Sequence, residues 1–187
     1  MEYQYSQCAK QCGIDMEETR LFPSDICDGY FGTKRFDRKN DSFGEHRIHM
    51  LTAAALLELD FRQPNMDYHQ LMKLTKILTR DNKHDIENMY RRMCFNVFAH
   101  NRDDHSKNFT FIYDENNDGW RLSPAYDLTY STTYYGEHTT TVDGNGRNPG
   151  IKEHGCCWEQ QLEWKKIYAL KIAYDIEKCV KNELDGN

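Results

Sequence analysis

Residues 101–127 decide the fold of this chain, and they read N-R-D-D-H-S-K-N-F-T-F-I-Y-D-E-N-N-D-G-W-R-L-S-P-A-Y-D. The first eight of these residues are too polar to be buried, and the alternating run F-T-F-I-Y that follows predicts a strand. Residues 114–119 have the Asp, Asn and Gly chemistry of a hairpin turn, and residues 120–122 resume an extended pattern. We therefore expect a hairpin that returns the chain to the polar loop.

The predicted hairpin brings together three oxygen-bearing side chains, those of Asp103, Asn108 and Asp127. Phosphoryl transfer needs such a set, because one carboxylate takes the proton of the attacking hydroxyl while an amide and a second carboxylate hold Mg²⁺ against the nucleotide phosphates. Protein kinases have these groups in the order H-R-D-x-x-x-x-N and then D-F-G. Here the spacing from Asp103 to Asn108 matches, and Y-D-L at residues 126–128 takes the place of D-F-G, while the flanking letters differ.

Three motifs in order resemble those of the HipA-like serine/threonine kinases of bacterial toxin–antitoxin systems. The catalytic loop of that family is similar to D-x-H-x-K-N, and the matching residues here are Asp103, His105, Lys107 and Asn108. Its metal-binding aspartate lies in a P-x-Y-D motif, matched at residues 124–127, and its hinge resembles R-F-D-R, matched at residues 35–38. The motifs extend over most of the chain, so the resemblance is specific.

This resemblance implies an α+β, protein-kinase-like fold that is mostly helical. Residues 1–37 would be a remnant of the nucleotide lobe with a helix, strands and the hinge, and residues 38–187 the helical catalytic lobe. ATP and Mg²⁺ would be the cofactors, and a serine or threonine hydroxyl of a protein substrate would be the acceptor. Asp103 would act as the base, with Asn108 and Asp127 as metal ligands.

The resemblance also implies nucleotide-binding residues near the N-terminus, namely Glu2, Lys34, Arg35 and Phe36. Glu2 would take the place of the helix glutamate that pairs with the phosphate-binding lysine. The strand with Arg35 and Phe36 would be the hinge whose backbone meets the adenine, and Lys34 is the first candidate to replace an absent lysine. Arg35 and Asp37 could also be only a surface pair, and Phe36 only a core residue.

Alternative roles stay open in the polar loop. His105 could be a general base, since an ordinary pKa of about 6.5 suits proton transfer, but a structural role in bracing the loop is favoured. Lys107 is either a surface lysine or a cation that steadies the charge of the transferring phosphate. His100, Asp104 and His105 could instead bind the transition metal of a phosphohydrolase. That interpretation leaves Asn108 and Asp127 without a role.

The composition is that of a globular chain of 187 residues, with 39% hydrophobic and 29% charged residues. The formal net charge of −6 and the lack of a Lys/Arg-rich run argue against nucleic acid as a direct partner. No apolar run approaches the roughly 18 residues of a membrane span, and the first residues lack a signal-peptide pattern. We therefore expect a cytoplasmic protein without membrane contacts.

The seven cysteines are an odd number and show no C-x-x-C spacing. This pattern fits neither a secreted disulfide framework nor a zinc ribbon. Cys8 and Cys12 fall on one face of a predicted helix and are expected in the core. Cys156 and Cys157, adjacent in sequence, are expected in a small apolar patch.

In the N-terminal part, apolar spacing predicts a helix over residues 2–12, ended by Gly13. Two strands are expected next, at residues 21–22 and 30–36. The charged, turn-prone residues 37–45 are expected to link them to the helical part.

The C-terminal part should contain helices with apolar spacing over residues 48–55, 68–78 and 86–97, the last of which delivers the chain to the polar loop. Residues 139–142 can form an extended segment. One or two helices over residues 158–184 should complete the chain, with these core candidates: Leu162, Ile167, Ala173, Ile176 and Val180.

A working kinase also needs a glycine-rich turn over the phosphates and a lysine on the next strand, and neither is recognisable in this sequence. In the resembled family these elements precede the helix with which this chain begins. The chain would then be a C-terminal piece of a larger kinase, a protein completed by a separate N-terminal lobe polypeptide, or a degenerate pseudokinase. The alternative from another class is a non-catalytic module that docks an N-lobe or antitoxin partner.

Overall fold

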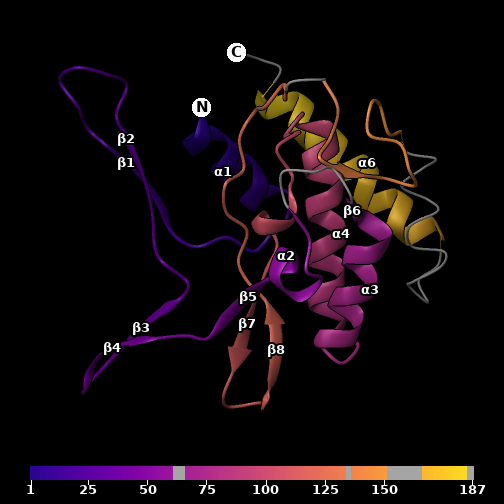
Figure 1. Ribbon diagram of the computed structural model, residues 1–187. Coiled ribbons are helices and arrows are strands. Elements are labelled where there is room, and N and C mark those ends of the chain that lie inside the picture. Colours follow the sequence, from indigo (N-terminus) through magenta and orange to yellow (C-terminus); the bar gives the residue numbers. More distant parts are fainter. Residues whose placement is uncertain (61–65, 134–135, 151–165, 185–187) are drawn as a thin grey trace.

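Packed helices and several small sheets make up a mixed fold (Figure 1). This computed structural model describes residues 1–60, 66–133, 136–150 and 166–184. The longer helices lie together, while two hairpins from the N-terminal part extend away from them (Figure 1).

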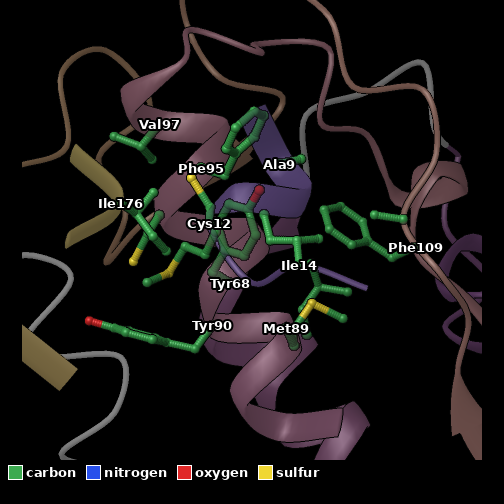
Figure 2. Packing of buried hydrophobic residues seen from close by; sticks show 14 of the residues in the cluster. Ala9, Cys12, Ile14, Tyr68, Met89, Tyr90, Phe95, Val97, Phe109 and Ile176 are labelled. Atoms are coloured by element: carbon green, nitrogen blue, oxygen red, sulfur yellow. The ribbon is translucent and has the colours of Figure 1, made fainter. Parts of the chain in front are cut away.

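The helix α4 (Lys83–Phe98) lies at the centre of the hydrophobic core. Against it pack α3 (Tyr68–Leu78) and α6 (Lys166–Leu184). Figure 2 shows Met89 and Phe95 of α4 among apolar side chains from neighbouring elements. The apolar spacing predicts α3 and α4, and both predictions are confirmed.

The N-terminal helix α1 (Glu2–Gln11) is also confirmed, and Gly13 follows it with a φ of +72°. That left-handed backbone is the conformation in which glycine ends a helix without strain. The hydroxyl of Tyr5 donates to the backbone oxygen of Ala99 at 2.9 Å and so ties α1 to the end of α4. Because α1 shares the core of the later helices, no separate core divides the chain after residue 37 among the described residues. The division into two lobes there stays a prediction.

The predicted hairpin is present as β7 (Thr110–Asp114) and β8 (Gly119–Leu122), paired antiparallel. The carboxylate of Asp114 closes its turn by accepting the backbone N–H of Asn116 at 3.1 Å. A third strand, β5 (Met50–Thr52), pairs with β7 on the side away from β8. The sheet order is therefore β5-β7-β8.

The prediction of a helix over residues 48–55 is wrong for most of that range. β5 takes up its middle, and only the short helix α2 (Ala53–Leu56) follows. The side chain of Thr52 caps α2 by accepting the backbone N–H of Ala55 at 3.2 Å. β7 offers a strand edge, and pairing with that edge outweighs the local helical spacing.

The two strands expected near the N-terminus are confirmed as the antiparallel pair β1 (Thr19–Phe22) and β2 (Tyr30–Thr33). β2 ends at Thr33, so its expected continuation to residue 36 is wrong. The linker expected at residues 37–45 is also wrong, because the chain forms a second hairpin from β3 (Arg38–Asp41) and β4 (Gly44–Arg47). Gly44 has a φ of +119°, which gives this tight turn a conformation that other residues rarely adopt.

The C-terminal helix α6 buries Ala173, Ile176 and Val180, as predicted. Ile167 is 79% exposed and is not a core residue, so that expectation is wrong. The expected helix start at residue 158 and the expectations for three further residues lie outside the described residues: Cys156, Cys157 and Leu162. None of the described helices is both long and apolar enough to cross a membrane.

The extended segment expected at residues 139–142 is present as β9 (Thr140–Thr141). It pairs in parallel with β6 (Met66–Asp67), directly before α3. The carboxylate of Asp67 then caps α3 by accepting the backbone N–H of His69 at 2.8 Å. The backbone N–H and the hydroxyl of Thr140 both donate to Asp104, which places β9 beside the polar loop.

Candidate active site

The polar loop leaves α4 in a sharp turn and enters β7 through a short 3-10 turn at Ser106–Asn108. His100 begins the loop with a φ of +52°. At its other end, Nδ2 of Asn108 donates to the backbone oxygen of Asp103 at 2.9 Å. This bond uses the amide nitrogen, so Oδ1 is the atom of Asn108 that can bind a metal ion.

Three further side chains of the catalytic-loop motif lie near this bond. The side chain of Asp103 is 55% exposed, so its carboxylate is open to solvent. Nε2 of His105 lies 3.9 Å from Oδ1 of Asp103, close enough to steady the carboxylate but longer than a hydrogen bond. Lys107 is exposed and lies directly before Asn108.

A buried network below the loop sets its position. Asp104 is 1% exposed, and its carboxylate accepts the hydroxyl of Tyr68 at 2.9 Å and the backbone N–H of Thr140 at 3.0 Å. Nδ1 of His138 lies 3.1 Å from the same carboxylate. Asn96 of α4 donates in turn to the Tyr68 hydroxyl at 2.9 Å. Asp103 and Asp104 are neighbours in sequence, but one is exposed and the other is a structural anchor.

Sequence reasoning missed this anchor and its partners. Burial, and then the charge of Asp104, hold the pKa of Tyr68 well above its ordinary value of 10.0, so the phenol is protonated and donates. The sequence contained one weak signal, because Asn96 is a polar residue inside the apolar pattern of α4. Nothing in the sequence pairs it with residues as distant as His138.

The alternative phosphohydrolase site is wrong. The carboxylate of Asp104 is already used by three donors in the buried network, while His100 is exposed. Among the described residues, His100, Asp104 and His105 do not form a cluster close enough to hold a metal ion.

The hairpin returns the chain to the polar loop, as predicted. The hydroxyl of Tyr126 donates to the backbone oxygen of Lys107 at 2.5 Å and lies 2.6 Å from Oγ1 of Thr110. Since a phenol has one proton, Thr110 is the donor in the second bond. Asp127 follows with a φ of +55° and an exposed side chain, and the buried Leu128 comes next.

A buried arginine of α4 supports the same segment from below, and sequence reasoning missed it too. Arg92 is 2% exposed, and its guanidinium donates to the backbone oxygen of Ser123 and, from Nε, to Oδ1 of Asn88 at 3.0 Å. Burial lowers the pKa of Arg92 to about 10, which leaves the side chain charged at neutral pH. Arg92 therefore fixes the backbone four residues before Asp127.

Glu2 lies beside Asp127, at the N-terminus of α1. Both residues line a small hollow together with Phe31, Thr33 and Leu128. Burial, and then the negative charge of Asp127, raise the pKa of the Glu2 carboxyl above its ordinary value of 4.5. A divalent cation would relieve this repulsion, and the carboxylate and amide oxygens of Asp127 and Asn108 are the hard ligands that Mg²⁺ prefers. The donor chemistry of Asp127 and Asn108 is thus compatible with Mg²⁺.

Of the residues at the predicted hinge, Phe36 packs near Tyr126, whereas Arg35 and Lys34 face acidic residues. The ring of Phe36 lies 5.5 Å from that of Tyr126, which places Phe36 at the site. Arg35 forms a bidentate, exposed ion pair with Asp37 at 2.7 and 2.6 Å, as the surface-pair alternative describes. Nζ of Lys34 is exposed and lies 3.9 Å from Glu17, and Lys34 is not part of the hollow lined by Glu2.

Comparison with known proteins shows the family. Residues 1–183 match the family described as "HipA-like C-terminal domain". The chain belongs to this family. The HipA-like match includes all three motifs, from the hinge at residues 35–38 to P-A-Y-D at residues 124–127.

Two relatives of this HipA-like chain extend the finding. The structure titled as the Shewanella oneidensis MR-1 toxin–antitoxin complex of HipA, HipB and operator DNA superposes with a TM-score of 0.76 at 17% identity, over 98% of this chain and 48% of that one. The curated protein "Putative kinase Y4dM" of Sinorhizobium fredii (strain NBRC 101917 / NGR234) is 27% identical over 156 residues, which are 76% of this chain and 36% of that protein. The chain thus spans about half the solved structure and about a third of the curated relative.

Proposed function

We propose that this chain is the catalytic lobe of a HipA-like serine/threonine protein kinase that uses ATP and Mg²⁺. The observation that supports it most is the hydrogen bond from Tyr126 to the backbone oxygen of Lys107. This bond joins the loop with Asp103 and Asn108 to the segment with Asp127, and kinase chemistry needs these two segments side by side.

Each loop residue has a distinct task in the proposed reaction. Asp127 and Oδ1 of Asn108 would hold Mg²⁺, which neutralises charge on the nucleotide phosphates when it is bound. The exposed carboxylate of Asp103 accepts the proton of the substrate hydroxyl, whose oxygen forms a bond to the γ-phosphorus as the bond to the ADP oxygen breaks. His105 braces Asp103 from 3.9 Å, and Lys107 steadies the charge of the transferring group.

The proposed kinase is completed by residues that this sequence does not contain. A glycine-rich turn and a phosphate-binding lysine are not recognisable here, and the chain spans 48% of the solved HipA chain. We propose that a further nucleotide-lobe segment, in the same polypeptide or a separate one, docks beside β1 and β2. Apolar side chains are exposed there: Leu21, Phe22, Ile26 and Tyr30.

An antitoxin-like protein is the second partner that we propose. The solved relative is titled as a complex with HipB and operator DNA. Because that complex includes DNA, it gives no support to the expectation that nucleic acid plays no part. The net charge of −6 bears only on direct contact, so we propose that this chain would reach DNA through its antitoxin partner.

Thermal unfolding with a non-hydrolysable ATP analogue tests the nucleotide site. At a hundredfold excess over the dissociation constant, ligand linkage is worth about 2.7 kcal/mol, or roughly 5–11 °C in melting temperature for a chain of this size. We expect Asp127→Ala to abolish most of that gain in the presence of Mg²⁺. An unchanged melting curve of the wild type at millimolar Mg-ATP analogue would refute nucleotide binding by this chain.

Asp143→Ala is the matched control. Asp143 is also an exposed aspartate with a positive φ, +52° against +55° for Asp127, so both substitutions disturb the backbone equally. Asp143 lies 3.6 Å from His69, and it does not line the hollow shared by Glu2 and Asp127. We expect its variant to keep the full gain from the nucleotide.

The rival function is a non-catalytic module that keeps this fold in order to dock its partners. The exposed apolar residues of β1 and β2 favour it, because they invite an added protein whether or not the site is active. Binding of a nucleotide-lobe polypeptide without any phosphate transfer would support this second function.

A further inference from the structure

Three cysteine thiols from two helices meet outside the proposed phosphoryl-transfer site. Cys8 lies on α1, Cys12 follows one turn later as the residue directly after that helix, and Cys179 comes from α6. Their sulfur atoms lie within 4.8 Å of one another, and all three are free thiols. Cys8 and Cys12 are 2% and 5% exposed, whereas Cys179 is half-buried. Solvent therefore has access to the cluster from the side of Cys179.

The spacing of the three sulfur atoms is close to that of a metal-thiolate site. With Zn–S bonds of about 2.3 Å, a tetrahedral site sets its sulfurs about 3.8 Å apart. The cluster would therefore have to contract by at most about 1 Å at its widest edge, which small rotations about the Cα–Cβ bonds can supply. Thiolates are soft ligands that select Zn²⁺ or Cu⁺ over Mg²⁺ and Ca²⁺.

A fourth ligand is at hand. Glu183 follows Cys179 by one turn of α6, which puts the two residues on the same face of the helix, although the carboxylate of Glu183 does not lie within 4.8 Å of all three sulfurs. Its side chain is exposed, so it can turn towards the cluster without breaking the core.

We propose that Cys8, Cys12 and Cys179 bind a thiophilic metal ion, Zn²⁺, with Glu183 as the fourth ligand. Such an ion joins the N-terminal helix to the C-terminal helix through bonds that span almost the whole chain. It thereby fixes α1, whose first residue, Glu2, lies beside Asp127. The proposal does not depend on kinase activity, because the metal acts on the packing of α1 against α6. It revises the expectation that the cysteines form only core, since spacing along the sequence cannot reveal a ligand from a distant helix.

Zinc titration of the reduced, metal-free chain tests this site. We expect one Zn²⁺ per chain by elemental analysis, and Co²⁺ substitution should give thiolate-to-metal absorption in the near ultraviolet. Loss of an outer-shell partner already costs metal sites 10–100-fold in affinity, so Cys179→Ser should raise the dissociation constant for Zn²⁺ at least about 100-fold. Glu183→Gln should raise it by about 10–100-fold.

Two controls separate this cluster from the other cysteines. Cys27→Ser removes an exposed cysteine between β1 and β2 that is not in the cluster, and it should leave zinc affinity within about twofold of wild type. The double variant Cys156→Ser/Cys157→Ser should behave in the same way. Zinc affinity that survives Cys179→Ser, or that is lost in the double variant, would overturn the proposal.

X-ray absorption on the zinc-loaded wild type keeps the test decisive if a variant fails to fold. We expect three sulfur neighbours at about 2.3 Å and one lighter atom. A first shell of mainly oxygen or nitrogen, or a disulfide that forms in place of zinc binding, would refute the site.

Discussion

Replacing Tyr68 by phenylalanine removes one oxygen atom from the network that positions the polar loop. The ring of Tyr68 is fully buried, so the change leaves its packing intact and acts only on hydrogen bonds. Its hydroxyl donates to the Asp104 carboxylate at 2.9 Å and accepts from Asn96 at 2.9 Å. A bond to a charged group contributes about 1.5–3 kcal/mol, and the amide of Asn96 left without its acceptor costs a further 1–3 kcal/mol or so.

Together these terms amount to about 2.5–6 kcal/mol, and we expect the lower end because Asp104 keeps its bonds from His138 and Thr140. A loss of about 3 kcal/mol in the free energy of unfolding lowers the melting temperature by roughly 6–12 °C for a chain of this size. Urea unfolding followed by circular dichroism measures it. Tyr174→Phe is the matched control, because Tyr174 is 60% exposed on α6 and should change stability by less than about 0.5 kcal/mol. If Tyr68→Phe changed the free energy of unfolding as little as Tyr174→Phe, the buried network would not hold the loop.

Three other predictions concern pH and catalysis. The pKa of Tyr68 is raised in the folded state, so its contribution is complete below the unfolded pKa of about 10 and is lost as pH rises further. The unfolding free energy of the wild type should thus fall more steeply above pH 10 than that of Tyr68→Phe, and equal slopes would contradict the raised pKa. In a chain extended by its nucleotide lobe, Asp103→Asn should abolish phosphate transfer while nucleotide affinity stays near wild type, and collapse of affinity in a binding assay would make Asp103 a metal ligand instead. Each missing phosphate-contacting element is worth about 10²–10³ in rate, so the 187 residues alone should be nearly inactive and should gain transfer when the lobe is supplied. Asp103-dependent transfer by the isolated chain would show that another residue, Lys34 first, replaces the lysine.

The local elements of this chain follow largely from its sequence. The helices α1, α3 and α4 and the hairpin β7–β8 repeat their apolar residues with the period of the element, and that period depends only on neighbouring residues. The approach of Tyr126 to Lys107 could also be predicted, because a hairpin necessarily returns the chain to its starting point. The motif residues Asp103, Asn108 and Asp127 lie next to these elements, in the loop before β7 and in the segment after β8.

Tertiary structure decided what depends on distant partners. Residues 50–52 pair with β7 instead of forming a helix, because the sheet edge satisfies their backbone groups. Asp103 and Asp104 are adjacent acids, yet only contacts from Tyr68, His138 and Thr140 make the second one a buried anchor. In the same way Cys179 joins Cys8 and Cys12 only because α6 packs on α1. Periodicity shows which face of an element is buried, but the partner across that face is chosen by the packing of the whole chain.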